Sequence, residues 1–469
     1  MITGRASGEA TEDALSAVAP RWRRRLGATG LHTAALGFGT YRVDEADGAH
    51  LAALDQALAG GIRLVDTAVN YGLGGAERAV GLALARGVEA GRLQREGVIV
   101  VSKVGYWQGE MLEWLRRSGD ADPRAVASLS PDHAHALGPA LIRHAASVSR
   151  GRLGLETLDV LLLHNPEYLL DPGPDALREA SGAERRAAFE ATILQAFRTL
   201  EELVGEGAIA WYGVSSNSLG ARVEQPGQTT VSAFVEAAEQ AARSVGASQH
   251  HLALLQAPVN LLEARGAEAA AEAARHGLAF LANRPLNAVT GGALVRLAAP
   301  GPGATTEALS AARKALRRLE AALDPGGASA FPRWSHELPG ALTRLATALD
   351  FDDFRTRYAD PRTEAALEAV QPAGPRAGVA VQAWRAEYRR HYEALMGAAR
   401  GVLAARDAAR LEALAAPLDD ALPEALRAGP LSRRALAFAA TRPGVTAALC
   451  GMRREAWVDE ALALLRSGA

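Results

Sequence analysis

The chain has 469 residues, of which 49% are hydrophobic, and its formal net charge is −2. This composition can fill a large core, and the near-neutral charge gives no electrostatic basis for binding nucleic acid or an anionic membrane. A single cysteine, Cys450, excludes intrachain disulfides and a cysteine-rich zinc site. No apolar run has membrane-spanning length, and the arginines at 21 and 23–25 precede no secretory apolar segment, so we expect a cytoplasmic protein.

Strand and helix patterns alternate along most of the chain. Residues 1–20 are predicted to form a flexible tail, followed by a hairpin and a first strand through 36–41. The predicted helices cover 49–59, 76–85, 139–152, 183–206, 231–245, 264–275, 432–441 and 454–465. The predicted strands that lead out of them end at or near Asp66, Lys103, His164, Val214, Gln256, Ala282 and Cys450. Eight such alternations predict an α/β fold, a parallel (β/α)8 TIM barrel with right-handed crossovers.

Two long segments interrupt this alternation. Residues 105–138 separate Lys103 from the next helix, and residues 286–431 separate the seventh strand from the last helical pairs. Helical patterns at 305–323, 338–349 and 379 to about 415 predict that the second segment is folded, because a structureless loop of that length would be unusual. We assign the barrel to 21–290 and 430–469, and a helical insertion after the seventh strand to 291–429. The insertion is either a lid over the catalytic face or a module for oligomerisation or stability.

Polar residues follow four of the apolar runs. Asp66 and Tyr71 follow one run, and Lys103 and His164 end two others. A (β/α)8 barrel places its catalytic groups at the carboxyl ends of its strands, so these four side chains are predicted to converge. A tyrosine beside an ammonium and a carboxylate is suited to proton transfer.

The ordered segments resemble the aldo-keto reductase superfamily. Within it, Lys103-Val104-Gly105-Tyr106 and His164-Asn165-Pro166-Glu167 look closest to an uncharacterised oxidoreductase-like branch. The matching segments are Asp66-Thr67-Ala68-Val69-Asn70-Tyr71-Gly72 with Glu77 and Gly81, then Ser102-Lys103, Leu163-His164, Gly213-Val214-Ser215-Ser216-Asn217, Gln256, and the tail from Pro443 to Arg454. The resemblance runs from about Arg24 to the C-terminus, apart from the two interrupting segments.

This resemblance implies an NADPH-dependent oxidoreductase that moves a hydride between nicotinamide and a small carbonyl or alcohol substrate. Tyr71 would be the general acid/base, and Lys103 would lower its pKa. Asp66 would hold Lys103, and His164 would orient the carbonyl oxygen. Two alternatives stay open, a cofactor-dependent lyase or epimerase and a non-catalytic NADP-binding regulatory protein.

The resemblance also implies a set of residues that bind NADP(H). They are Gly39, Thr40, Ser215, Ser216, Asn217, Gln256, Asn283, Arg284, Pro285, Leu286, Gly451, Arg453, Arg454 and Glu460. Arg453 and Arg454 suit a 2′-phosphate, which favours NADPH over NADH, although they could be plain surface arginines. Two family features are missing, since Asn283 replaces the aromatic that stacks on nicotinamide and Ala461 lies where an asparagine commonly contacts adenine.

The other polar and aromatic residues have simpler interpretations. We expect Trp107 and Trp114 to pack their loop, although they could stack on a substrate ring. The sequence near the pairs His133/His135 and His250/His251 offers no convincing carboxylate or cysteine ligands, so no metal site is predicted. Glu167 is expected in a solvated loop, although it could shape the substrate pocket. An oligomer could form through the insertion.

Overall fold

The structure is a computed structural model that describes residues 1–468, apart from 224, 264, 291–292, 299–302, 323–330 and 371–376. The chain divides into two compact units. The first contains residues 1–291, 422–429 and 433–469, and the second contains 292–421 and 430–432. No helix in the described ranges is both long and apolar enough to cross a membrane.

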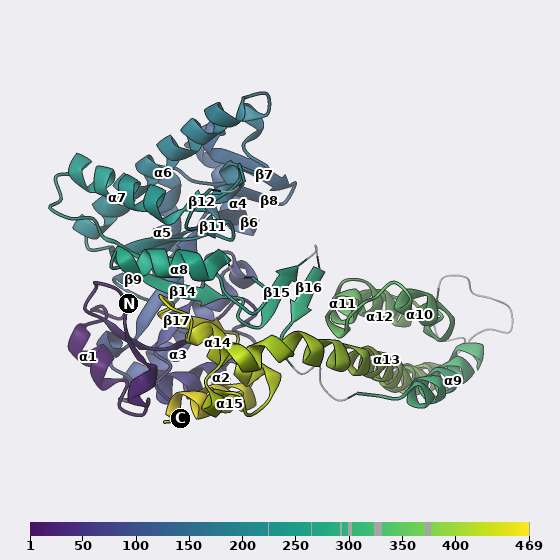
Figure 1. Cartoon of the computed structure of the whole chain (residues 1–469). Helices are drawn as coiled ribbons and strands as arrows, with labels where there is room; N and C mark the ends of the chain where they lie inside the picture. The colour runs from purple at the N-terminus through teal and green to yellow at the C-terminus, as the bar shows by residue number, and fades with distance from the viewer. Residues whose placement is uncertain are drawn as a thin grey trace. The chain divides into compact units, whose positions relative to one another are not determined.

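The first unit is a closed barrel of eight parallel strands, as predicted (Figure 1). In barrel order these are β3 (Leu36–Gly39), β4 (Leu64–Asp66), β5 (Ile99–Val104), β9 (Leu158–His164), β10 (Ile209–Ser215), β13 (Leu252–Pro258), β14 (Ala279–Asn283) and β17 (Ala447–Cys450). β17 pairs with β3 and closes the ring. Every residue of β5, β9 and β13 is buried, as expected for parallel strands that are covered on both faces.

Helices surround these strands in the order in which the chain supplies them. They are α2 (Gly48–Ala59), α3 (Gly75–Glu89), α5 (Pro139–Leu153), α6 (Gly182–Gly205), α7 (Val231–Ser244), α8 (Arg265–Arg275), α14 (Leu431–Ala440) and α15 (Glu455–Arg466). Ser181 and Glu184 form a capping box that starts α6. A Cβ at Gly81 of α3 would lie 2.8 Å from the Arg152 carbonyl oxygen of α5, so only glycine lets these two helices approach this closely.

The N-terminal residues are packed on the barrel, so our expectation of a flexible tail is wrong. Ile2 forms a bridge with Leu155, and the Ala6 N–H donates to Asp159 Oδ1 at 2.7 Å. The other oxygen of Asp159 pairs with Arg95 at 2.9 Å. These contacts give residues 1–20 buried partners, and the segment contains α1 (Gly8–Asp13). The predicted hairpin follows as β1 (Arg23–Arg25) and β2 (His32–Ala34).

The segment after β5 is folded rather than a plain loop. It forms an antiparallel sheet in the order β6 (Tyr106–Gln108), β8 (His133–Ala136), β7 (Val126–Ser130), with α4 (Gly109–Ser118) between β6 and β7. The alternation of histidine and alanine in His133–Ala136 is a sequence signal for this sheet, but it is too short to predict a strand by itself. The remaining short strands of the first unit are β11 (Leu219–Gly220), β12 (Thr229–Thr230) and β15 (Asn287–Thr290).

The second unit is mostly helical and has its own apolar core. Its elements are β16 (Ala293–Arg296), α9 (Thr306–Ala322), α10 (Trp334–Leu342), α11 (Ala348–Phe354), α12 (Asp360–Ala369) and α13 (Ala377–Ala421), with a π-helical turn (Arg355–Ala359) between α11 and α12. α13 packs along α9, and the core contains Leu316, Trp334, Phe351 and Leu395. The single helix predicted at 338–349 is wrong. A capping box of Thr347 and Asp350 starts α11 separately from α10.

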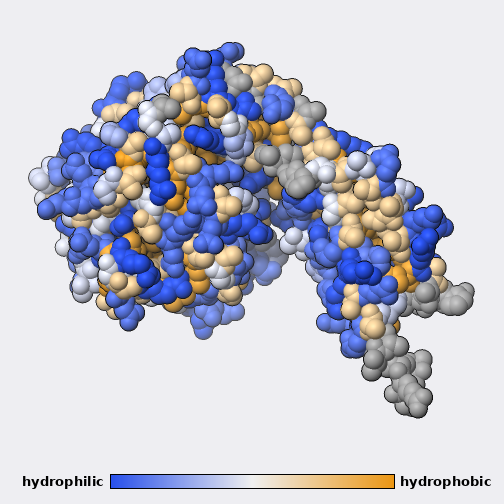
Figure 2. Space-filling view, turned by 90° about the horizontal axis from the view of Figure 1, so that it is seen from below, coloured by the Kyte–Doolittle hydropathy of each residue, from blue (hydrophilic) through white to orange (hydrophobic). Residues whose placement is uncertain are grey.

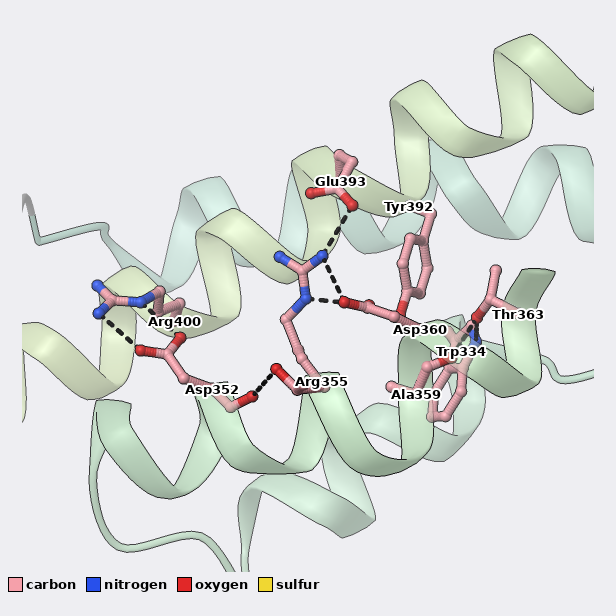
Figure 3. Close-up of polar contacts among 10 residues, drawn as sticks. Trp334, Asp352, Arg355, Ala359, Asp360, Thr363, Tyr392, Glu393 and Arg400 are labelled. Carbon is pink, nitrogen blue, oxygen red and sulfur yellow. Dashed lines mark hydrogen bonds and ion pairs between the residues drawn. The ribbon is translucent and has the colours of Figure 1, made fainter. Parts of the chain in front are cut away.

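Ion pairs fasten the π-helical turn and its neighbours to α13 (Figure 3). The Arg355 guanidinium bonds Asp360 at 3.1 Å and Glu393 at 2.7 Å. Arg400 of α13 pairs with Asp352 of α11 at 2.8 Å. Exposed pairs of this kind contribute about 0–1 kcal/mol each, so the core carries most of the stability of this unit.

The surface is largely hydrophilic on the face shown in Figure 2, with apolar residues in small groups. The exposed large apolar side chains of the chain include Tyr41, which is 65% exposed, and Leu73, which is 61% exposed. Both belong to loops that follow barrel strands, β3 and β4 respectively. Exposed apolar residues at strand ends of a barrel are candidates for ligand contact.

Candidate active site

The carboxyl ends of three neighbouring barrel strands bring the four predicted catalytic residues together. Asp66 ends β4, Lys103 is the penultimate residue of β5 and His164 ends β9. Tyr71 begins a 3-10 turn shortly after β4. The ring of Tyr71 lies edge-on to the ring of His164, with 5.9 Å between their centroids.

Lys103 is the centre of this cluster. Its Nζ donates to Asp66 Oδ2 at 2.7 Å, to the Thr67 carbonyl at 2.9 Å and to the Tyr71 hydroxyl oxygen at 3.2 Å. An ammonium has three N–H donors, so all of them are used. Because the Tyr71 oxygen accepts from Lys103, its own O–H is left to donate to another group. Lys103 is fully buried and Asp66 is nearly so, which strengthens their attraction.

The electrostatics of Tyr71 differ from our expectation. Burial, together with the nearby Asp66 carboxylate, raises the pKa of the Tyr71 hydroxyl well above its ordinary value. The predicted lowering of the Tyr71 pKa by Lys103 is therefore wrong. Burial also lowers the pKa of Lys103, against the opposing effect of Asp66. Tyr71 is consequently a neutral phenol near pH 7, the form that can give up a proton.

His164 is held among aromatic rings. Tyr106 lies edge-on to it at a centroid distance of 4.7 Å, closer than Tyr71. Burial and the positive charge of Lys103 lower the pKa of His164 well below its ordinary value. The imidazole is therefore neutral near pH 7 and can donate one N–H to a carbonyl oxygen.

Several predicted cofactor-binding residues are hydrogen-bonded to the same cluster. Gln256 Nε2 donates to Asp66 Oδ1 at 2.8 Å, and Gln256 Oε1 accepts from Ser215 Oγ at 3.0 Å and from Asn283 Nδ2 at 3.3 Å. The strand register places Ser215 between His164 and Gln256. The structure thus links the predicted amide-binding side chains to the Lys103–Asp66 pair.

The other predicted cofactor-binding residues lie at the same end of the barrel. Thr40 donates from its backbone N–H and its hydroxyl to the Asp66 carbonyl, at 2.9 and 3.0 Å. Ser216 is buried against Thr229, and the backbone N–H of Asn217 donates to Glu167. Arg284 pairs with Glu263 at 2.8 Å. Gly39 ends β3, whereas Pro285 and Leu286 follow β14. Gly451, Arg453 and Arg454 follow β17, and Glu460 lies within α15.

Glu77 supports the cluster from α3. Its carboxylate accepts from Ser102 Oγ at 2.7 Å and from Arg152 at 3.3 Å. Arg152 in turn donates to the Val69 carbonyl at 3.0 Å, in the loop between Asp66 and Tyr71. Glu77 is fully buried, so it fixes both the residue before Lys103 and the loop that carries Tyr71.

Comparison with known proteins identifies the family of the chain. The family model described as Aldo/keto reductase family matches residues 35–320, which is more than half of the chain. The chain belongs to the aldo/keto reductase family. The D-threo-aldose 1-dehydrogenase of a Pseudomonas species is 28% identical over an alignment of 204 residues, and the match covers 40% of this aldo/keto reductase and 52% of the relative. The chain therefore spans about half the length of this curated relative.

The matches to solved structures have lower sequence identity. A glycerol dehydrogenase from Gluconobacter oxydans is 19% identical, and the match covers 95% of this chain and 90% of that one, with a TM-score of 0.47. An aldo/keto reductase from Klebsiella pneumoniae, solved with NADP and acetate, is 24% identical, and the match covers 56% and 68%, with a TM-score of 0.35.

The aldo/keto reductase site also contains residues to which the sequence assigned no catalytic or cofactor-binding role. Tyr106 and His135 contact the His164 segment, and Tyr106 directly follows the Lys103-Val104-Gly105 motif, which is a usable signal. Glu167 is 9% exposed, so our expectation of a solvated loop role is wrong. Trp107 stacks on Trp114 at a centroid distance of 5.9 Å, and Trp114 stacks on His144 at 3.6 Å. These contacts confirm that both tryptophans pack the segment after β5.

Glu167 gives a prediction for the pH dependence of stability. Burial raises the pKa of its carboxyl to about 7, from an ordinary value of 4.5. Between these values the folded protein keeps a proton that the unfolded chain releases, so the free energy of unfolding falls as pH rises, by about 1.4 kcal/mol per pH unit. Glu167→Gln removes this group, while its amide oxygen can still accept from the Asn217 N–H.

Urea unfolding at pH 5 and pH 8 measures the effect. From pH 5 to pH 8, the free energy of unfolding of wild type should fall by about 2–3 kcal/mol more than that of Glu167→Gln. Identical pH dependences in the two proteins would contradict the prediction. Asp175 is an exposed carboxylate paired with Arg178, and Asp175→Asn is a control variant that should follow wild type.

Proposed function

We propose that this aldo/keto reductase is an NADP(H)-dependent oxidoreductase that interconverts a carbonyl group and an alcohol on a small molecule. The observation that carries the proposal is the placement of Lys103 Nζ between Asp66, at 2.7 Å, and the Tyr71 hydroxyl, at 3.2 Å. A phenol with an ammonium at its oxygen and a free O–H is arranged to give a proton to an alkoxide and to receive it back.

The residues at the strand ends fit a nicotinamide dinucleotide. Asn283 Oδ1 is buried and has no hydrogen-bond partner among the described residues, so it is an acceptor available to a carboxamide N–H. Ser215 and Gln256 supply further amide and hydroxyl groups beside it. Arg453 and Arg454, just before the start of α15, would hold a phosphate. When bound, the dinucleotide supplies or accepts the hydride.

The side chains of this enzyme would manage the proton. In reduction, the neutral imidazole of His164 donates a hydrogen bond to the carbonyl oxygen, and Tyr71 transfers its proton as negative charge develops there. The ammonium of Lys103 stabilises the phenolate that remains, and Asp66 holds Lys103 in place. In oxidation, the phenolate accepts the proton of the alcohol. A general acid of this kind contributes about 10²–10⁴-fold to the rate.

Cofactor preference is tested by fluorescence titration with NADPH and NADH in parallel. Arg453→Ala with Arg454→Ala should weaken NADPH binding at least about tenfold, because a charge-assisted hydrogen bond contributes about 1.5–3 kcal/mol, and should change NADH binding less than about twofold. Arg178→Ala, which removes an exposed arginine paired with Asp175, is the matched control. Equal affinities for both cofactors in wild type would contradict the phosphate role of the two arginines.

A further inference from the structure

The backbone at the end of β9, at His164 and Asn165, has an unusual conformation and an unusual hydrogen-bond partner. β5 ends at Val104, which pairs with Leu163, so the His164 carbonyl lies one residue past the last pair with β5. A side chain contacts this carbonyl, since His135 Nε2 lies 2.8 Å from its oxygen. The next residue, Asn165, has φ of +49°, a left-handed conformation that is uncommon for residues other than glycine.

Tyr106 makes two further contacts with the same dipeptide. Asn165 Nδ2 donates to the Tyr106 hydroxyl at 2.7 Å, and the Tyr106 ring lies edge-on to the His164 ring at 4.7 Å. His135 is fully buried and packs against the Tyr106 ring, with 5.6 Å between centroids. Tyr106 and His135 are also paired with each other across β6 and β8. One short sheet therefore contacts the carbonyl, the imidazole and the following side chain.

Gly105 shows how tightly these groups are packed. It joins β5 to β6 with φ of +145°, and a Cβ at this residue would lie 2.8 Å from both His135 Nε2 and the His164 carbonyl oxygen. Any side chain here would push His135 away from its acceptor. The glycine thus permits the contact between the β6–β8 sheet and the end of β9.

The protonation of His135 is set by its partner. A carbonyl oxygen can only accept, so Nε2 carries the proton. Burial lowers the pKa of His135 to about 4, which keeps the ring neutral near pH 7. His135 is consequently a fixed neutral donor, and it adds no second positive charge beside Lys103 and His164.

We propose that His135 and Tyr106 are positioning residues that hold the His164 imidazole in its reactive orientation; this inference rests on the proposed function. No hydrogen bond to the buried Nδ1 of His164 exists among the described residues, so the ring is not fixed by a partner of its own at that atom. Its orientation depends on the backbone that His135 anchors and on the ring that Tyr106 places against it. A displacement of about 1 Å at a reacting group can cost about 10²-fold in rate.

The test compares variants at two residues of the sheet with a control variant at a third. His135→Leu removes the donor, whereas His135→Gln keeps an N–H near the position of Nε2. Tyr106→Phe removes the acceptor for Asn165 and keeps the ring. Trp107→Phe is the matched control, because Trp107 Nε1 donates to the Ala136 carbonyl at 3.0 Å and so holds the same sheet from a different side chain. For each variant we would measure kcat with an aldehyde, the Kd for NADPH, the melting temperature and a crystal structure.

The expected result is a separation of effects. His135→Leu should lower kcat about 10–100-fold with an NADPH Kd within about twofold of wild type, and His135→Gln should restore most of the loss. Trp107→Phe should lower the melting temperature while retaining kcat. A wild-type kcat in His135→Leu, or losses of kcat that follow the melting temperature across all four variants, would overturn the proposal.

The structures of the variants separate this inference from the proposed function. If wild type turns over no carbonyl substrate, the proposed function fails, and the orientation of the His164 ring decides the inference alone. A rotated or shifted ring in His135→Leu that returns in His135→Gln supports positioning by His135. An unmoved ring in His135→Leu overturns it.

Discussion

Replacing Tyr71 with phenylalanine is expected to lower kcat for carbonyl reduction by about 10²–10⁴-fold, because the general acid is lost. The ring remains, and with it the edge-on packing against Tyr41 and His164. The NADPH Kd should therefore stay within about twofold of wild type. Steady-state kinetics with an aldehyde and NADPH, combined with a fluorescence titration, measure the two quantities separately.

Tyr41 offers the control for this experiment. Its ring centroid lies 5.1 Å from that of Tyr71, and it is largely exposed, but its hydroxyl makes no contact with Lys103 in the structure as described. Tyr41→Phe should keep kcat within about threefold of wild type. Full turnover in Tyr71→Phe would contradict the assignment of Tyr71 as the proton donor.

Replacing Lys103 with methionine is expected to have the largest effect on stability. The variant leaves the Asp66 carboxylate buried without its ammonium, and breaking a buried ion pair from one side costs about 3–5 kcal/mol. It also removes the cation beside the Tyr71 oxygen, so kcat should fall at least as far as in Tyr71→Phe. Urea unfolding and steady-state kinetics provide the two measurements.

The double variant Lys103→Met with Asp66→Asn separates stability from catalysis. Without either charge, the buried site contains no unpaired ion, and the amide introduced by Asp66→Asn can still bond Gln256, so most of the lost stability should return. Activity should not return, since no ammonium is left to stabilise the phenolate. If the double variant were as unstable as Lys103→Met alone, the charge-based explanation would be wrong.

The barrel and the four catalytic candidates were predictable because their signals are local. Apolar runs such as Leu158–His164 are buried on both faces, and each ends in a polar residue at the same end of a parallel sheet. The rest depends on contacts between distant segments. His135 meets His164 across 29 residues of sequence, and Asp66 meets Gln256 across 190. A pattern of single residues contains no information about such partners.

The errors of sequence reasoning have specific physical causes. The sequence of residues 1–20 predicts a flexible segment. However, the backbone N–H of Ala6 donates a hydrogen bond to the buried Asp159, which also pairs with Arg95. Thr347 lies within a helical pattern, although its hydroxyl caps the next helix. The prediction for the pKa of Tyr71 takes only the charge of Lys103 into account, whereas burial has the larger effect on this pKa and raises it.

The most direct test of the central claim follows a labelled hydride. The protein is incubated with NADPH carrying deuterium in the hydride position of its nicotinamide ring and with a panel of small aldehydes and aldoses, and the products are analysed by mass spectrometry. The account predicts an alcohol with one deuterium on the former carbonyl carbon, formed by wild type and not by Tyr71→Phe. Conversion without deuterium would indicate a lyase or epimerase, and NADPH binding without any conversion would indicate a regulatory protein; either result would contradict the account.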